Sequence, residues 1–158
     1  MSKRLEGKIA IITGGGSGIG EAISKRFASE GAEVIILDID EKLARKVADP
    51  INGKYFQCDI SDFNSVETVF KKISDEESYP DILVNNAGIA HIGNAMNTDP
   101  DDFDRIMRVN VRGPYLCIRA IVPSMIKKGG GSILNLASVA SNLGIPDRFA
   151  YSTSKGAV

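Results

Sequence analysis

The chain has 158 residues, of which 43% are hydrophobic and 25% are charged, and its formal net charge is −1. This length and composition predict one globular domain over residues 1–158, and the near-zero charge excludes strong electrostatic attraction to nucleic acid or to an anionic membrane. No apolar stretch is long enough for a signal peptide or a membrane-spanning helix, so we expect a soluble, cytoplasmic protein.

The first half of the chain alternates apolar strands with helical segments. Residues 8–13 predict a strand covered on both faces, because positions 9–12 are continuously apolar. A glycine cluster follows, and then come a helix over residues 19–29, a strand over 34–37 that ends at Asp38, a short helix over 41–48 that stops before Pro50, and a weaker strand over 54–58.

The second half continues this alternation. Ser61 is typical of a helix N-cap, and the apolar positions after it recur with helical spacing. Gly113-Pro114 should interrupt or kink a later helix, because proline removes a backbone donor. The remaining predicted elements are a buried strand over residues 82–84, a helix that starts at Asp99 and Pro100, a helical stretch that ends near residue 128, and a strand over 133–136.

Strands separated by helix-length crossovers indicate an α/β fold. Connections of this length join parallel strands, and the helices then cover both faces of the sheet. The predicted architecture is a doubly wound parallel sheet of the Rossmann type, in three α-β-α layers. Cys58 and Cys117 fit no metal-ligand spacing, so we expect no metal site and interpret both as buried thiols in a reducing compartment.

A glycine-rich segment lies between the first strand and the first helix, with the sequence Thr13-Gly14-Gly15-Gly16-Ser17-Gly18-Ile19-Gly20. Glycines there let the backbone approach a pyrophosphate closely, and the helix N-terminus offers unpaired N–H groups and a partial positive charge. Glycines also form ordinary structural turns. However, the second strand ends in Asp38, about 20 residues further on, where dinucleotide-binding folds place an acid for the ribose hydroxyls. The segment therefore predicts a dinucleotide site.

Asp38 also indicates which dinucleotide is bound. A carboxylate at this position can accept hydrogen bonds from both ribose hydroxyls of NAD, and it would repel the extra phosphate of NADP. No arginine or lysine lies within residues 14–20, and Ile39 rather than a basic residue follows Asp38. The sequence therefore favours NAD as the cofactor.

Further motifs follow in order along the chain. The glycine spacing is G-x-x-x-G-x-G, Asp59 follows the third strand, Asn85-Asn86-Ala87-Gly88 follows the fourth, Asn110 precedes the Gly113-Pro114 break, Ser138 follows the fifth strand, and Tyr151-Ser152-Thr153-Ser154-Lys155 has the spacing Y-x-x-x-K. In this order and spacing, the chain resembles the short-chain dehydrogenase/reductase family along its entire length.

The resemblance implies a role for each motif. Asp59 would hydrogen-bond the adenine ring, and segment 85–88 would close over the adenosine side and brace the central sheet. The implied catalytic residues are Asn110, Ser138, Tyr151 and Lys155. The implied cofactor-binding residues are Gly14, Gly16, Ser17, Gly18, Ile19, Gly20, Asp38, Ile39, Asp59, Ile60, Asn86, Ala87, Gly88, Tyr151 and Lys155.

The chemistry of Tyr151 and Lys155 agrees with these roles. The two residues are four apart on a predicted helix, so their side chains share one face. A phenol ordinarily keeps its proton at neutral pH, but a nearby ammonium and a positive nicotinamide ring both favour the phenolate that a general base needs. Ser138, at the carboxyl end of a strand, can donate to the substrate oxygen. Asn110 would fix a backbone irregularity and a water that connects Lys155 to solvent, a role that only the resemblance implies.

The predicted reaction interconverts a secondary alcohol and a ketone by hydride transfer, with Tyr151 as general acid/base. A non-catalytic dinucleotide-binding module and a reductase of 3-oxoacyl thioesters are the alternatives. The glycine spacing argues against a third class, the sugar-nucleotide epimerases and dehydratases.

Residues 141–150 should line the substrate pocket between Ser138 and Tyr151. This segment is polar for a steroid or a long acyl chain, and Arg148 is a natural partner for a carboxylate. We expect a small polar substrate, such as a hydroxy acid, a sugar acid or a polyol, contacted by Ser138, Arg148 and Tyr151. A surface ion pair is the alternative role of Arg148.

The chain ends at Val158, shortly after Lys155. Members of the family continue through two more strands and a helical lid, so we expect this chain to be incomplete at its C-terminus. Residues 133–136 should then form an exposed apolar edge of the sheet. The resemblance also implies a homo-oligomer, a dimer or a tetramer, built through the helix of residues 115–125 and the helix that carries Tyr151.

Overall fold

The computed structural model describes residues 3–76 and 79–158. Its strands form one parallel sheet in the order β3-β2-β1-β4-β5. The strands are β1 (Ile9–Thr13), β2 (Glu33–Asp38), β3 (Lys54–Gln57), β4 (Ile82–Asn85) and β5 (Ser132–Asn135). The order reverses between β1 and β4, which confirms the predicted doubly wound Rossmann-type fold.

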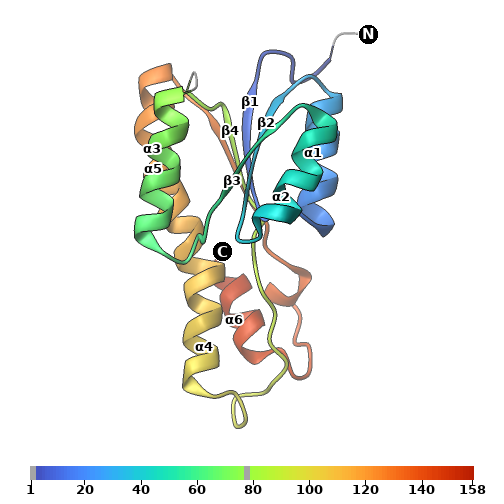
Figure 1. The fold of residues 1–158 in the computed structure, drawn as a ribbon. Coiled ribbons are helices and arrows are strands. Elements are labelled where there is room, and N and C mark those ends of the chain that lie inside the picture. The colour runs from blue at the N-terminus through green and yellow to red at the C-terminus, as the bar shows by residue number, and fades with distance from the viewer. Residues whose placement is uncertain (1–2, 77–78) are drawn as a thin grey trace.

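Helices cover both faces of this sheet (Figure 1). The helices α1 (Gly18–Ser29) and α2 (Glu41–Ala48) pack on one face, and α3 (Phe63–Glu76) and α5 (Gly113–Lys128) pack on the other, which gives the expected three layers. The helices α4 (Pro100–Met107) and α6 (Phe149–Ala157) pack against each other beyond one end of the sheet. The short segments are η1 (Asp49–Ile51), η2 (Arg108–Arg112), which joins α4 to α5, and η3 (Val139–Ser141).

Each face of the sheet has its own apolar core. Alternate residues of a strand point to opposite faces, so Ile9 and Ile11 join the core that also holds α3 and α5 residues. Ala10 and Ile12 join the core that holds α1 and α2 residues. This burial on both sides explains why β1 is an unbroken apolar run in the sequence.

The parallel register brings the carboxyl ends of the strands to one edge. Thr13 pairs with Leu37 in β2, and Asn85 pairs with Asn135 in β5. The glycine-rich loop, the acid at the end of β2 and the segment after β4 therefore start from neighbouring points. Parallel α/β sheets bind their ligands at this edge, and α4 and α6 extend beyond it (Figure 1).

The start of α3 differs from the sequence prediction. Ser61 is not its N-cap, because α3 begins at Phe63 and Asp62 Oδ1 accepts a hydrogen bond from Ser65 N at 2.6 Å. Ser61 donates instead to Asp59 Oδ1 from both its N and its Oγ. Serine and aspartate are about equally good N-caps, so residue type alone could not choose between them.

The predicted break at Gly113-Pro114 takes the form of a π-helical turn, η2. Helix α5 starts at Gly113, with Pro114 in its first turn, where no backbone donor is needed. The widened turn directs Asn110 inward, where it is 1% exposed. A Cβ at Gly113 would stand 2.6 Å from Ile60 Cδ1, so this glycine lets α5 start against the loop after β3.

The strands β3 and β5 form the two edges of the sheet. As predicted, β5 is an exposed apolar edge, with Leu134 51% and Ile133 37% exposed. The described part of the chain contains no helix that is long and apolar enough to cross a membrane.

Candidate functional site

The glycine-rich loop leads from β1 into the N-terminus of α1. Gly14 turns the loop with a φ of +61°, a left-handed conformation that other residues disfavour. A Cβ at Gly16 would stand 2.9 Å from both Asp38 Oδ2 and Ala44 N, so the loop can pass this close to α2 only with glycine there. The N–H groups and the dipole at the start of α1 favour an anion beside the loop.

Asp38 lies at the end of β2, opposite this loop. Its Oδ2 accepts a hydrogen bond from Gly16 N at 2.9 Å, and its Oδ1 accepts one from Asp40 N at 3.1 Å. Backbone donors on both sides therefore fix the orientation of the carboxylate. Each oxygen has a second lone pair, so the carboxylate can still accept hydrogen bonds from a ligand.

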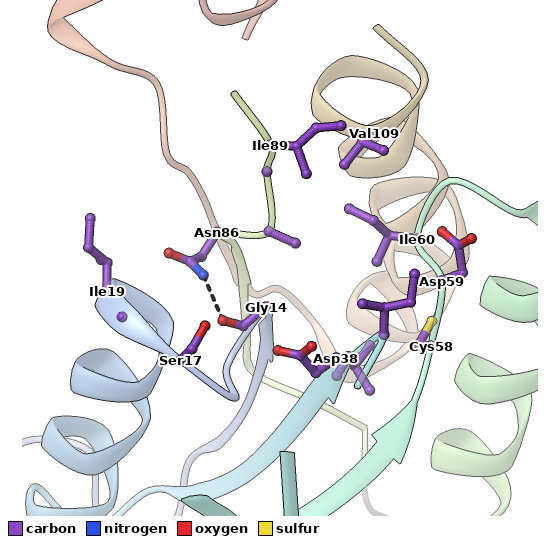
Figure 2. A pocket seen from close by; sticks show the side chains of 15 residues that line it. Gly14, Ser17, Ile19, Asp38, Cys58, Asp59, Ile60, Asn86, Ile89 and Val109 are labelled. Atoms are coloured by element: carbon purple, nitrogen blue, oxygen red, sulfur yellow. Dashed lines mark hydrogen bonds between the residues drawn. The ribbon is translucent and has the colours of Figure 1, made fainter. Parts of the chain in front are cut away.

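A cavity of about 420 Å³ lies between these elements (Figure 2). This volume is within the range of about 300–1,000 Å³ that is usual for small-molecule sites. The cavity is lined by Gly14, Ser17, Gly18, Ile19, Leu37, Asp38, Ile39, Cys58, Asp59, Ile60, Asn86, Ala87, Gly88, Ile89 and Val109. Most of the predicted cofactor-binding residues thus surround one cavity. The others, which are Gly16, Gly20, Tyr151 and Lys155, lie outside its lining.

Two apolar residues that were not predicted, Ile89 and Val109, line part of the cavity. Figure 2 shows them with Ile60, which was predicted, on the side opposite Ser17 and Ile19. Such a surface suits the flat face of an adenine or nicotinamide ring. In the sequence, Ile89 and Val109 could not be distinguished from core residues, because they are simply apolar positions near a strand or a helix.

Leu37 and Cys58 also belong to the apolar part of the lining. Burial raises the pKa of the Cys58 thiol to about 11, so the group is neutral at physiological pH. Cys58 therefore acts as a small apolar side chain here, as its sequence context predicted.

Asn86 ties the segment after β4 to the glycine-rich loop. Its Nδ2 donates to Thr13 O at 2.9 Å and to Gly14 O at 3.1 Å, the second of which is drawn in Figure 2. The buried Thr13 Oγ1 accepts hydrogen bonds from Asn86 N and Ala87 N, both at 3.1 Å. A Cβ at Gly20 would collide with Gly14 O and Asn86 Nδ2. Gly20 therefore serves the site by letting α1 pack closely and not by lining the cavity.

Asp59 follows β3 and lies at the edge of the cavity. Its Oδ1 accepts hydrogen bonds from Ser61 N at 2.9 Å and from Ser61 Oγ at 2.7 Å. Its own N donates to Ser65 Oγ at 3.0 Å. These bonds hold the carboxylate in place beside Ile60, where the family resemblance implies the adenine ring.

Tyr151 and Lys155 lie on one face of α6, as their spacing predicts. Lys155 Nζ is 6.0 Å from the centre of the Tyr151 ring, and it donates to Leu136 O, just after β5, at 2.7 Å. Lys155 is only 7% exposed, and burial lowers the pKa of its ammonium. An ammonium has three donors, so hydrogen-bonding capacity is left for a ligand.

Asn110 connects η2 to two other elements. Its Oδ1 accepts a hydrogen bond from Ile89 N at 2.8 Å, and its Nδ2 donates to Ile89 O and to Ser154 Oγ, both at 2.9 Å. A Cβ at Gly88 would stand 3.2 Å from Asn110 Oδ1 and 3.5 Å from Lys155 Nζ. Asn110 Oδ1 and Lys155 Nζ therefore both lie close to Gly88, which lines the cavity.

Ser138 and Arg148 lie on the segment that joins β5 to α6. Ser138 is the N-cap of η3, and its Oγ accepts a hydrogen bond from Ala140 N at 3.2 Å. Arg148 precedes α6, and its Nη1 donates to Asp147 O at 2.9 Å. Neither residue lines the 420 Å³ cavity. Their predicted contacts with a substrate stay predictions.

The loop, the acid, the bracing asparagine and the tyrosine–lysine pair thus occupy one edge of the sheet. The family model for short chain dehydrogenases matches residues 8–158. The chain belongs to the short-chain dehydrogenase family. This finding confirms the resemblance that the motifs indicated.

Relatives within the short-chain dehydrogenase family include a D-xylose 1-dehydrogenase of Caulobacter vibrioides, which is 37% identical over 159 residues and covers 98% of this chain and 62% of the relative. A metagenomic short-chain oxidoreductase in complex with NADP has a TM-score of 0.91 and 33% identity, covering 97% of this chain and 72% of the other. The 3-ketoacyl-(acyl-carrier-protein) reductase from Brucella melitensis, complexed with NADH, has a TM-score of 0.92 and 43% identity, covering 96% and 66%. The chain spans about three fifths of the length of the curated relatives it matches.

Proposed function

We propose that this chain carries the cofactor site and the catalytic groups of an NAD-dependent oxidoreductase that interconverts a secondary alcohol and a ketone. The observation that carries the proposal is the position of Gly88, which lines the cavity and on which a Cβ would stand 3.5 Å from Lys155 Nζ. At this position, a cavity suited to a dinucleotide lies close to a buried ammonium and a phenol.

The residues of the cavity fit a nicotinamide dinucleotide. The glycine-rich loop and the N-terminus of α1 suit the pyrophosphate, and the braced Asp38 carboxylate suits the ribose hydroxyls. A Cβ at Gly16 would fill the gap between loop and carboxylate, so the space depends on glycine. NAD is favoured over NADP because Asp38 repels a ribose phosphate and Ile39 offers no positive charge. Solved relatives carry either NADP or NADH.

The groups at the other end of the cavity supply acid/base chemistry. Bound NAD+ would supply the hydride acceptor. Tyr151 takes the proton of the substrate hydroxyl, and the charge of Lys155 stabilises the phenolate that does so. Because Lys155 is buried, its charge acts through a medium of lower dielectric than water. Ser138 donates a hydrogen bond to the same substrate oxygen.

The proposed substrate is a small polar alcohol, such as a sugar acid, a polyol or a hydroxy acid. The Caulobacter relative, by its name, acts on a sugar. Arg148 supports an acidic group on the substrate, because its bond to Asp147 O occupies only one of five guanidinium donors. A 3-oxoacyl thioester is the second candidate, since the Brucella relative is a ketoacyl reductase at 43% identity.

The test is to follow NADH absorbance with a panel of sugars, polyols and hydroxy acids, each supplied with NAD+ or NADP+. The same chain is assayed in the reverse direction with 3-oxoacyl thioesters. We expect turnover with a member of the first panel, faster with NAD+ than with NADP+. Arg148→Ala should slow turnover of carboxylated substrates more than that of uncharged ones.

Other results of this assay would support a different substrate or exclude part of the proposal. Turnover of thioesters alone would select the second candidate, and an equal effect of Arg148→Ala on charged and uncharged alcohols would remove the carboxylate contact. NADH binding without turnover of any compound would indicate a non-catalytic dinucleotide-binding module. Absence of NADH binding would overturn the proposed function.

A further inference from the structure

Ser154 lies on α6 between Tyr151 and Lys155 and takes part in no step described above. Its side chain is completely buried. Its Oγ donates to Tyr151 O at 2.7 Å and accepts from Asn110 Nδ2 at 2.9 Å. A buried hydroxyl whose donor and acceptor are both used forms a fixed link between the groups it joins.

The direction of each hydrogen bond in this link follows from the backbone. Ile89 N–H can only donate, so the Asn110 amide atom that it meets is Oδ1. The other amide atom is therefore Nδ2, which donates to Ile89 O and to Ser154 Oγ. Because Ser154 accepts that bond, its own proton goes to Tyr151 O. Neither side chain can turn without leaving a buried polar group unpaired.

The link joins the elements that surround the tyrosine–lysine end of the cavity. Ile89 lines the cavity, Asn110 lies on η2, and Tyr151 lies on α6. Without Ser154 Oγ, one N–H of the buried Asn110 amide loses its partner. The amide then has to rotate, or α6 has to shift relative to the Ile89 segment, to satisfy that donor.

We propose that Ser154 is a positioning residue that sets α6, and with it Tyr151 and Lys155, against the nicotinamide end of the cofactor cavity. The inference rests on the proposed function, because it concerns how one half of the dinucleotide is held. The proposal predicts different effects on the two halves of the cofactor. Loss of the Ser154 hydroxyl weakens the contacts of the nicotinamide half and leaves the adenosine half, beside Asp38 and the glycine-rich loop, unchanged.

The test compares Ser154→Ala with a matched control, Ser152→Ala. Ser152 lies on the same helix, and its buried Oγ has no hydrogen-bond partner within the described structure, so the same change there removes no bond. Binding of NADH and of ADP is measured by calorimetry for the wild type and both variants. Ser154→Ala should weaken NADH binding about tenfold, as expected when one buried donor is left unpaired, and should leave ADP binding unchanged. Ser152→Ala should bind both as the wild type does.

A double-variant cycle separates positioning from a general loss of structure. Ser154 and Asn110 belong to one link, so the NADH losses of Ser154→Ala and Asn110→Ala should not add in the double variant. If Ser154→Ala does not fold, Ser154→Cys replaces it, because it keeps the shape and weakens the hydrogen bonds. The same NADH-specific loss is expected. Additive losses, or equal losses of NADH and ADP affinity, overturn the proposal.

The wild type distinguishes failure of this inference from failure of the proposed function. If the wild type binds neither NADH nor ADP, the proposed function is wrong and the positioning role falls with it. If the wild type binds both, and Ser154→Ala binds NADH as tightly as Ser152→Ala does, the positioning role alone is wrong.

Discussion

The two ends of the parallel sheet differ in whether a buried charged side chain has an oppositely charged partner. Where β1 and β4 begin, Asp81 Oδ2 accepts a hydrogen bond from Ile9 N at 3.0 Å and lies 2.8 Å from Lys128 Nζ, and Oδ1 lies 3.3 Å from Lys8 Nζ. Burial alone would raise the pKa of the Asp81 carboxyl, but the hydrogen bonds from Lys128, Ile9 and Lys8 outweigh it and lower the pKa. Lys8, Asp81 and Lys128 are therefore paired within the chain at this end.

Where the strands finish, Lys155 is buried beside Tyr151 and donates to a backbone carbonyl, Leu136 O, in place of a carboxylate. Burial lowers the pKa of its ammonium, so the folded chain disfavours the charged form. This end also contains the cavity and the left-handed turn at Gly14.

The fold therefore places the charges that stabilise it and the groups that bind a ligand at opposite ends of the sheet. Paired charges stabilise the folded state at the first end, whereas at the second end an ammonium is held at some cost to folding and is available to a ligand. We therefore expect Asp81→Ala to lower stability without changing ligand affinity, and Tyr151→Phe to lower turnover without changing stability.

The largest effect is expected from Tyr151→Phe, which removes one phenol oxygen. Turnover should fall at least about a hundredfold, the lower bound for a general acid/base group. The thermal unfolding midpoint and NADH affinity should stay as in the wild type, because the ring still packs beside Lys155. Steady-state kinetics, thermal melts and NADH titration measure these quantities. A variant with nearly normal turnover would exclude Tyr151 from the chemistry.

Asp81→Ala should act on stability alone. The free energy of unfolding should fall by about 3 kcal/mol, because Ile9 N–H and Lys128 lose a largely buried partner. Urea unfolding measures this loss, and NADH titration at a temperature where the variant is folded serves as its control. Reduced NADH affinity in the folded variant would contradict the separation of the two ends.

Asp38→Asn tests the cofactor preference without disturbing the loop. The variant can keep an oxygen for Gly16 N and loses the negative charge, while its NH2 group replaces the oxygen that accepts from Asp40 N. We expect NADH affinity to fall about tenfold, as for a lost charge-assisted hydrogen bond, and NADPH affinity to fall less or to rise. Competitive titration of the two dinucleotides measures the ratio. An unchanged ratio would mean that Asp38 does not select the cofactor.

The smallest effect concerns Lys155→Met and pH. The folded pKa of Lys155 is lower than the unfolded value, so its charge destabilises the folded state at neutral pH. That cost disappears as the pH rises through the lowered pKa toward about 10.4. The wild type should therefore gain stability relative to Lys155→Met between neutral and alkaline pH, in urea unfolding at several pH values. A gain toward acidic pH would show that the sign is wrong.

Much of the fold could be predicted from local patterns. The unbroken apolar run of β1 indicated a strand covered on both faces, and the glycine-rich loop followed by Asp38 indicated a ligand edge. These signals work because each depends on neighbours in sequence or on one strand–helix unit. The lining of the cavity by Gly14 and Asp38 follows from them, whereas Asp59 and Asn86 were predicted from the family resemblance.

The other features of the site depend on contacts between residues that are far apart in the sequence or that compete with their neighbours. The Asn110–Ser154 bond spans 44 positions and exists only because a π-helical turn directs Asn110 inward. Ile89 and Val109 line the cavity but have the same apolar character as core residues. Asp62 caps α3, because the Ser61 hydroxyl already donates a hydrogen bond to Asp59. Residue type alone does not reveal which of two neighbouring residues will act as the cap.

The widened turn at η2 should make the structure sensitive to the deletion of a residue within 108–112. A π-turn is equivalent to one residue inserted into a continuous helix, and the wider turn accommodates it. Deleting one residue from 108–112 would restore the α-helical pitch and remove the widened turn that directs Asn110 inward. Asn110 would then lose its hydrogen bonds with Ile89. Single-residue deletions in this turn are therefore expected to be more harmful than substitutions at the same positions.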